Sequence, residues 1–243
     1  MRKASIILVL IAWLAVPAMA SPRASEPAAP AGAAAGDSGE VLHYEWKLKG
    51  ALSAIAALFL PDRGSGTLTT GNGEDGRVVT ELRIESETNR SGEFWEYGAQ
   101  IEPVEGDTEL VWSAYRWRGE ESSKREELDD GIIDVVSGIW TLRQAPPDAP
   151  RRMEIWSDGK LYPVLVQPGG SEQHLVCGET RTARHVTVRG VRVPDRRFWK
   201  GSLELWLADD PAATPTRIVL DRGWARVRLD LTGRSTADGE TGC

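Results

Sequence analysis

Apolar and polar residues alternate along most of this chain. Leu203, Leu205 and Leu207 are separated by Glu204 and Trp206, and residues 78–85, 185–193 and 225–231 repeat with the same period of two. This alternation is typical of strands with one buried face. Gly- and Asp-rich turn signals separate the alternating runs, among them "TGNGEDG", "QPGGS" and "DRG". About ten short strands at such regular spacing favour an antiparallel sheet.

The sequence "SDGK" at residues 157–160 is the clearest turn signal. It lies between "RMEIW" and "LYPVLV", both of which have the character of strands. Asp-Gly supplies the positive backbone angles of a type I′ turn. A tight hairpin is therefore predicted here.

One segment repeats with the period of a helix instead. Ile132, Val135, Val136, Ile139 and Trp140 follow an i, i+3, i+4, i+7, i+8 pattern, which places them on one face of an α-helix. Asp129 and Asp130 precede this stripe and Arg143 follows it, where each charge complements the helix dipole. We expect the concave face of a curled sheet to bury the stripe. The predicted fold is mainly β: an antiparallel curled sheet or open β-barrel of about ten strands that encloses one central amphipathic helix.

A second stretch, residues 51–62, is almost free of polar side chains. Leu52, Ile55, Leu58 and Phe59 fit a short helix that Pro61 ends. Its apolar character predicts a contact with a ligand, or a peripheral contact with a membrane through residues 51–60.

The first residues have the three parts of an export signal. A basic start at Arg2 and Lys3 precedes an apolar run of about ten residues, and small residues follow up to Ala20. We expect a signal peptide over residues 1–20, cleaved after Ala20, and a periplasmic mature protein without a transmembrane segment. Residues 21–40 are rich in Ala and Pro and predict a flexible linker. One β-rich domain is expected over residues 41–233, with a flexible tail over residues 234–243.

Charge narrows the range of partners. The formal net charge of the chain is −7, and binding to nucleic acid needs a basic surface. We therefore expect no nucleic-acid partner.

Four segments together resemble the DUF3108 family of exported bacterial proteins, whose role is uncharacterised. They are "HYEWKLKG", "DVVSGIWTLR", "SDGKLYPVLV" and "LELWLADDPAATPTRIVLDRGWARVRLDL". The resemblance runs from about Tyr44 to Leu231. It implies an open, mostly antiparallel sheet curled around helical elements, similar in architecture to bacterial lipoprotein carriers. It provides no catalytic residues.

The mature chain has two cysteines, Cys177 and Cys243. An exported protein can form a disulfide between them, and the other interpretation is a buried, inert Cys177 with a free Cys243. The sequence "HLVC" also places His174 three residues before Cys177. Residues three apart in a strand point to opposite faces, and no second CxxC or HxxxH completes a tetrahedral site. We therefore expect no metal or cofactor, and interpret the pair as a surface histidine beside a packed cysteine.

No catalytic constellation stands out. The chain lacks GxSxG and a glycine-rich phosphate loop, and its many acids lie in turns or at alternating strand positions. A hydrolase is the last of the hypotheses.

Nine tryptophans remain after removal of the signal peptide. Aromatic rings favour the half-buried surface of a sheet, and they also form the walls of apolar pockets. The preferred hypothesis is a non-enzymatic periplasmic protein that binds an apolar ligand, a lipid or an acyl chain, in a half-barrel. The predicted binding residues are Ile132, Val136, Ile139 and Trp140 along the lining, and Leu52, Ile55 and Phe59 at the mouth.

Two alternatives remain open. A structural or partner-binding envelope protein would have no small-molecule ligand and would carry an apolar patch on its outside. A polysaccharide-binding module would need coplanar, exposed tryptophan rings in a groove.

Overall fold

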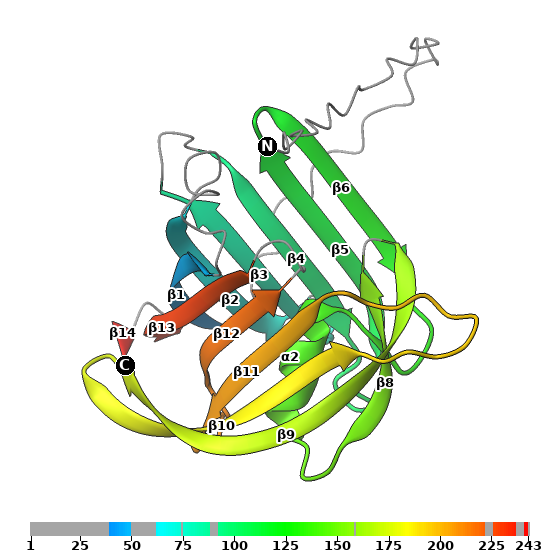
Figure 1. The fold of residues 1–243 in the computed structure, drawn as a ribbon. Helices are drawn as coiled ribbons and strands as arrows, with labels where there is room; N and C mark the ends of the chain where they lie inside the picture. Colours follow the sequence, from blue (N-terminus) through cyan, green and yellow to red (C-terminus); the bar gives the residue numbers. More distant parts are fainter. Residues whose placement is uncertain are drawn as a thin grey trace, which may run out of the picture. The chain divides into compact units, whose positions relative to one another are not determined.

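A computed structural model describes residues 39–49, 62–73, 75–87, 92–157, 159–221, 226–236 and 241–242. These residues form fourteen strands and one helix, α2 (Figure 1). The bounds of the elements, in chain order, are β1 (Glu40–Lys49), β2 (Arg63–Asn72), β3 (Val78–Ser86), β4 (Phe94–Ile101), β5 (Thr108–Trp117), β6 (Glu120–Glu127), β7 (Ile132–Ile133), α2 (Val135–Gln144), β8 (Arg151–Ser157), β9 (Lys160–Val176), β10 (Glu179–Gly190), β11 (Ser202–Ala208), β12 (Pro215–Asp221), β13 (Arg226–Thr236) and β14 (Thr241–Gly242).

All fourteen strands belong to one sheet. The order is β6-β5-β4-β3-β2-β1-β13-β12-β11-β10-β9-β8-β7, and β14 pairs with β13 outside this path. Consecutive strands pair within two antiparallel series, β1–β6 and β8–β13, which the β1–β13 pair joins from Glu40 opposite Thr236 to Lys49 opposite Arg226. The predicted curled, mainly β fold is therefore confirmed, with more strands than the ten expected.

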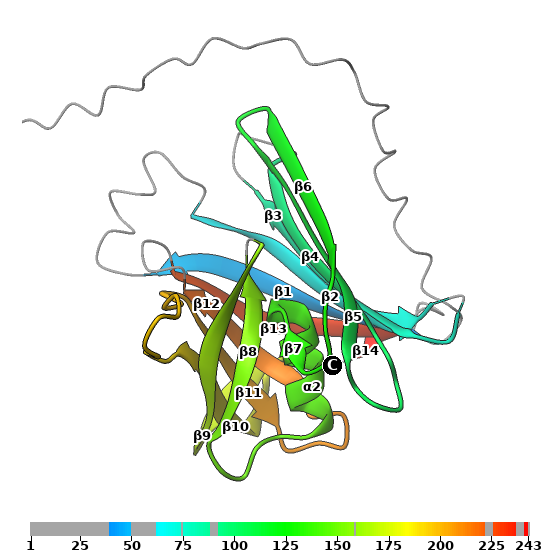
Figure 2. The same cartoon turned by 90° about the vertical axis from the view of Figure 1, so that its right-hand side faces the viewer.

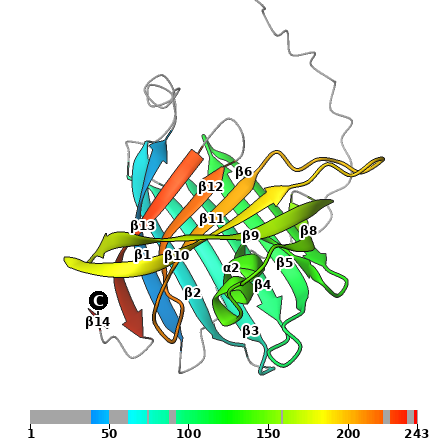
Figure 3. The ribbon, with the colours of Figure 1, turned by 60° about the horizontal axis from the view of Figure 1, so that its bottom comes forward.

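The sheet curls around α2, which lies on its concave side (Figures 2 and 3). The helix packs against β3 and β4 from one series and against β8 and β11 from the other. Val136, Ile139 and Leu142 are at most 1% exposed and join the main core, to which β11 contributes its three leucines. The alternation of the strands and the Val136 and Ile139 part of the helical stripe thus bury a common core, as the sequence predicted.

The helix begins later than its apolar stripe predicted. Ile132 and Ile133 form β7, which pairs in parallel with Glu154 and Ile155 of β8. The N-cap is Asp134, rather than Asp129 or Asp130. Its carboxylate accepts a hydrogen bond from the Ser137 backbone N–H at 2.7 Å, and the Ser137 hydroxyl accepts one from the Asp134 N–H at 2.8 Å. This capping box fixes the helix start and leaves the two isoleucines free to pair with β8.

The last turn of α2 is tied to the sheet by a charged side chain. Arg143 donates hydrogen bonds to the Glu40 carboxylate at 2.6 Å and to the Ala212 carbonyl oxygen at 3.2 Å. Glu40 also pairs with Arg234 at 3.1 Å. This buried arginine therefore ties the end of the helix to β1 and to the loop between β11 and β12.

The predicted domain boundaries need one correction. The flexible tail was predicted to begin at residue 234. Arg234 and Ser235 still belong to the sheet, because they pair with β1 and with the two residues of β14. The expected signal peptide over residues 1–20 and nearly all of the linker over residues 21–40 lie outside the described residues. The predicted 157–160 hairpin is confirmed, with Ser157 opposite Lys160.

Candidate functional site

A cavity of about 350 Å³ opens at one end of the curled sheet. Segments from both series of strands form its walls, and the first residue of α2, Val135, contributes to them. The lining residues are Tyr97, Val135, Ser157, Tyr162, Phe198, Trp199, Lys200, Gly201, Ser202, Leu220 and Asp221. The volume lies within the range of small-molecule sites, and the lining combines aromatic and aliphatic side chains with polar ones.

The apolar walls of the cavity continue the main core. Tyr97, Val135, Tyr162, Trp199 and Leu220 are partly buried and pack against that core. Tyr97 lies on the face of β4 that turns toward the helix, and Tyr162 lies opposite Ile155 in the β8–β9 hairpin. Part of the main core is therefore exposed to solvent in this cavity.

Two glycines hold Trp199 in this wall. A Cβ atom on Gly190 would lie 2.2 Å from the Trp199 carbonyl oxygen, and one on Gly201 would lie 2.6 Å from the indole ring. Both distances are too short for any side chain, so glycine at these positions allows the backbone and the ring to approach closely.

Further rings extend beyond the cavity along β4 and β5. The rings of Trp95 and Trp117 lie 5.5 Å apart at an angle of 38°. Tyr115 is opposite Trp95 in the strand pairing and 39% exposed. Because the two indole planes are tilted, this pair does not provide the coplanar surface that the polysaccharide hypothesis requires.

Toward the other end of β4 and β5 lies a second, smaller core. Ile132 and Trp156 pack there with Ala99, Ile101 and Val111 from β4 and β5. The Trp156 indole N–H donates a hydrogen bond to Glu126 of β6 at 2.7 Å. Strands near the two edges of the sheet thus meet at this end.

The predicted binding residues lie mostly in these two cores. Val136 and Ile139 are fully buried in the main core, and Ile132 is 7% exposed in the smaller one. Trp140 is half-buried against the smaller core. None of these four lines the cavity, whose helical wall is the neighbouring Val135. The predicted mouth residues Leu52, Ile55 and Phe59 lie outside the described residues.

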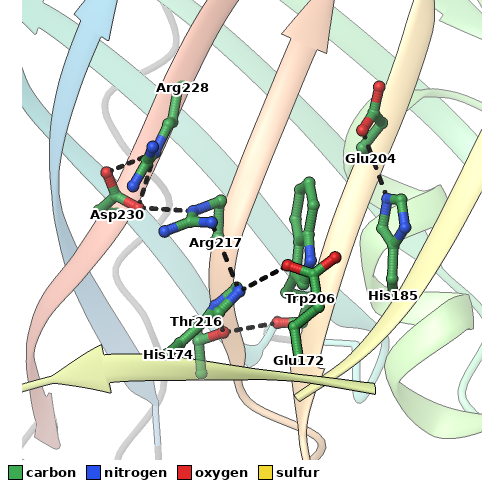
Figure 4. Close-up of polar contacts among 9 residues, drawn as sticks. All are labelled: Glu172, His174, His185, Glu204, Trp206, Thr216, Arg217, Arg228 and Asp230. Carbon is green, nitrogen blue, oxygen red and sulfur yellow. Dashed lines mark hydrogen bonds and ion pairs between the residues drawn. The ribbon is translucent and has the colours of Figure 1, made fainter. Parts of the chain in front are cut away.

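A polar cluster occupies the opposite face of β11 and β12 (Figure 4). At its centre Trp206 is 7% exposed, lies parallel to His185 with ring centroids 4.2 Å apart, and has the Arg217 guanidinium 5.4 Å from its ring. Asp230 accepts hydrogen bonds from Arg217 at 2.7 Å and from Arg228 at 3.0 Å. Burial alone would raise the pKa of Asp230, but these hydrogen bonds outweigh it and lower the pKa.

His174 joins this cluster from β9 and is not the surface residue that we expected. It is 5% exposed, because its ring packs against β12 and lies 3.0 Å from the Thr216 hydroxyl. Burial and the neighbouring Arg217 lower the pKa of the His174 imidazole. The expectation for Cys177 was also wrong. It is exposed in the turn after β9, with a φ of 53°.

Cys177 takes part in a disulfide. Its predicted partner, Cys243, lies outside the described residues, and the pairing with Cys243 stays a prediction. Within the described part of the chain, no three His, Cys, Asp or Glu side chains are grouped so that they could hold a metal ion. No helix in that part is long and apolar enough to cross a membrane.

Comparisons with known proteins support the architecture. No family model matches the chain, so membership of DUF3108 stays a prediction. No curated protein matches it either. The crystal structure of a beta-barrel-like protein of the domain of unknown function DUF1849, from Brucella abortus, is similar with a TM-score of 0.50 at 9% identity. The alignment covers 83% of this chain and 98% of that one. The two proteins share a fold.

A second solved structure is a domain described as an outer membrane lipoprotein-sorting protein, from Vibrio parahaemolyticus. Its TM-score is 0.36 at 8% identity, over 84% of this chain and 88% of that one. This similarity is too low to support a functional argument.

Sequence reasoning did not identify Tyr97, Tyr162, Trp199 and Leu220 as a group. They come from four separate strands and loops, and a period-two pattern shows which face a side chain occupies but not which residues face each other across a curl. One signal was available. Gly201 directly follows "FWK", and glycine near a tryptophan indicates a close approach to the backbone.

Proposed function

We propose that this protein is an exported, periplasmic, non-enzymatic protein that binds an apolar ligand, such as a lipid or an acyl chain, in the cavity at the open end of its half-barrel. The observation that supports it best is the cavity itself, lined by Tyr97, Tyr162, Trp199 and Leu220 and continuous with the main core. Burying apolar ligand surface there would contribute about 25 cal/mol per Å² before the costs of association.

The polar residues of the lining suit an amphiphile. Ser157 at the end of β8, Lys200 just before β11, and the facing Ser202 and Asp221 of β11 and β12 form the polar part of the lining. Lys200 is exposed and makes no ion pair with another described residue. A ligand with a carboxylate or phosphate group could place its chain against Tyr97 and Leu220 and its charge near Lys200.

Native mass spectrometry of the exported protein, followed by extraction with organic solvent, tests this proposal. We expect a bound apolar species, or uptake of added oleate by the delipidated protein. The variant Leu220→Gln should reduce the uptake of oleate at least about tenfold, because it places an amide in the apolar wall. Leu175→Gln is the matched control, since Leu175 is 75% exposed on β9 and does not line the cavity.

A protein that takes up no apolar probe while it remains folded would contradict the proposal. Equal oleate binding by the Leu220 and Leu175 variants would contradict the placement in this cavity.

The second candidate function is binding of a protein partner in the cell envelope. It is favoured by the rings of Trp95, Tyr115 and Trp117, which lie beyond the cavity on the arm formed by β3–β6 (Figure 2). Tyr115→Ser would then weaken capture of that partner and leave the uptake of oleate unchanged.

A further inference from the structure

The loop between β10 and β11, residues 191–201, differs in charge from the rest of the protein. It carries four basic side chains and one acidic one in a chain whose net charge is −7. Figure 1 shows the loop projecting beyond the ends of both strands. Its basic residues Arg192, Arg196, Arg197 and Lys200 are all exposed.

An aromatic side chain lies among these bases. Phe198 is 40% exposed, and the Arg192 guanidinium lies 5.0 Å from the centroid of its ring. Few large apolar side chains of the described residues are this exposed. Another of them is Leu161, 37% exposed in the neighbouring β8–β9 hairpin, next to the exposed Lys160.

The structure fixes this arrangement. Trp199 approaches Gly190 and Gly201 closely and packs against the main core, whereas its neighbour Phe198 is 40% exposed. The Val191 N–H donates a hydrogen bond to the Pro163 carbonyl oxygen at 3.0 Å, which ties the loop to β9. Arg196 is further held by an ion pair with Glu154 of β8.

The other basic side chains near Phe198 are available to bind a partner. Arg197, Lys200 and Lys160 make no ion pair with another described residue. An exposed aromatic ring surrounded by unpaired basic side chains matches the interface of an anionic bilayer, where rings enter the headgroup region and each Lys or Arg near the surface adds attraction. A protein partner would instead need a broad complementary face.

We propose that residues 191–201, together with Lys160 and Leu161, form a docking surface for an anionic phospholipid bilayer. Phe198 and Leu161 enter the headgroup region, and Arg192, Arg197, Lys200 and Lys160 face the lipid phosphates. Because Phe198 and Lys200 also line the cavity, docking brings the cavity mouth to the membrane. The docking surface does not depend on the proposed ligand, since it rests on the charge and exposure of the loop alone.

Flotation with lipid vesicles tests the proposal. The purified exported protein is mixed with vesicles of phosphatidylcholine, with or without phosphatidylglycerol. We expect binding only when phosphatidylglycerol is present, with a decline as salt is added. The double variant Arg192→Glu/Arg197→Glu should bind at least about tenfold more weakly, because each base contributes about a fivefold increase in partition near an anionic surface.

The matched control is Arg181→Glu/Arg184→Glu, which makes the same change of charge on β10, away from the loop. We expect it to bind within about threefold of the wild type, since screening limits the effect of distant charges. Leu161→Ser should weaken binding severalfold without any change of charge. None of these five positions lines the cavity, so the uptake of oleate reports separately on the proposed function.

Absence of flotation with both vesicle types would overturn the proposal and direct attention to an acidic protein partner for the loop. Equal losses in the two double variants would also overturn it, because they would show attraction by overall charge. Circular dichroism on every variant confirms that the fold is intact.

Discussion

The two ends of the β4–β5 pair, a closed end at Ala99 and Val111 and an open end at Trp95 and Tyr115, are built from apolar residues that differ in burial. At the closed end, Trp156 of β8 meets β4, β5 and Glu126 of β6, and the cluster is almost fully buried. At the open end, Tyr97 and Trp95 continue the same face of β4 but are only partly buried, and Tyr97 lines the cavity. A cavity and half-buried rings result.

This comparison shows that aromatic content does not by itself indicate a binding site. A ring on the concave face becomes core where the sheet closes over it, and part of a binding wall where the sheet stays open. The function proposed here therefore depends on the curvature of the sheet more than on any motif.

The largest expected effect on stability comes from two separate variants, each of which places an aspartate at one end of the same face of β5. Val111 is fully buried at the closed end of β5, whereas Tyr115, four residues further on, is 39% exposed at the open end. Val111→Asp should lower the free energy of unfolding by more than about 4 kcal/mol, because it buries an unpaired charge. Tyr115→Asp should cost less than about 1 kcal/mol. Urea unfolding measures both, and similar losses would show that the open end is packed like the closed one.

Asp134 tests the junction between the two ends. It lies between β7 of the closed end and Val135 of the cavity wall. Burial raises the pKa of its carboxyl to about 6, although the hydrogen bonds from Ser137 act to lower that pKa. Because the folded state binds this proton more tightly than the unfolded chain, the stabilisation is complete below the unfolded pKa of about 4. It is lost as the pH rises through about 6.

Asp134→Asn keeps an oxygen that accepts from the Ser137 N–H and removes the buried charge. We expect it to raise the free energy of unfolding by roughly 1 to 3 kcal/mol at pH 7 and by little at pH 4. The exposed Asp130 provides the control Asp130→Asn, which should change the free energy of unfolding by less than about 0.5 kcal/mol. Denaturant melts from pH 4 to 7 measure the difference, and parallel curves for the wild type and Asp134→Asn would contradict the assignment.

A smaller effect distinguishes two aromatic residues of one hairpin. Trp156→Phe removes the hydrogen bond to Glu126 and should cost about 1 to 2 kcal/mol. Tyr162→Phe, at the open end, should change the free energy of unfolding by less than about 0.5 kcal/mol. If Tyr162→Phe cost as much as Trp156→Phe, the contrast between the ends would not hold for this hairpin.

The smallest effect is expected at His174, on the outer face and away from both ends. Burial and Arg217 lower the pKa of its imidazole. Its contribution to stability is therefore complete above the unfolded pKa near 6.5 and is lost as the pH falls below it. His174→Gln should make stability less sensitive to pH between about 6.5 and 5 and leave the uptake of oleate unchanged. A change in that uptake would connect the polar cluster to the cavity.

The sequence was sufficient for the main architecture and insufficient for the site. Alternation of Leu203, Leu205 and Leu207, and the stripe through Val136 and Ile139, predicted the core of the sheet and of the helix correctly. The stripe placed Ile132 on the helix. A helical pattern does not show where a capping box starts the helix, and the box at Asp134 starts it after Ile132.

The cavity was beyond such patterns for a different reason. Its walls come from β4, β8, β9, β11, β12 and the loop before β11. How closely these segments approach one another depends on the curl of the sheet. That curl includes the pairing of β1 with β13, two strands that are far apart in the sequence. His174 illustrates the same limit. Its burial results from β9 lying against β12, a contact between strands that are not neighbours in the sheet.

Photo-crosslinking with a fatty acid that carries a diazirine on its chain shows directly whether the cavity binds an apolar ligand. Peptide mass spectrometry then locates the labelled residues. We expect labels on the segments that contain Tyr97, Tyr162 and Trp199, and we expect these labels to disappear when unlabelled oleate competes. Labels confined to the outer face around Trp206, or labels that oleate does not displace, would rule out binding in the cavity.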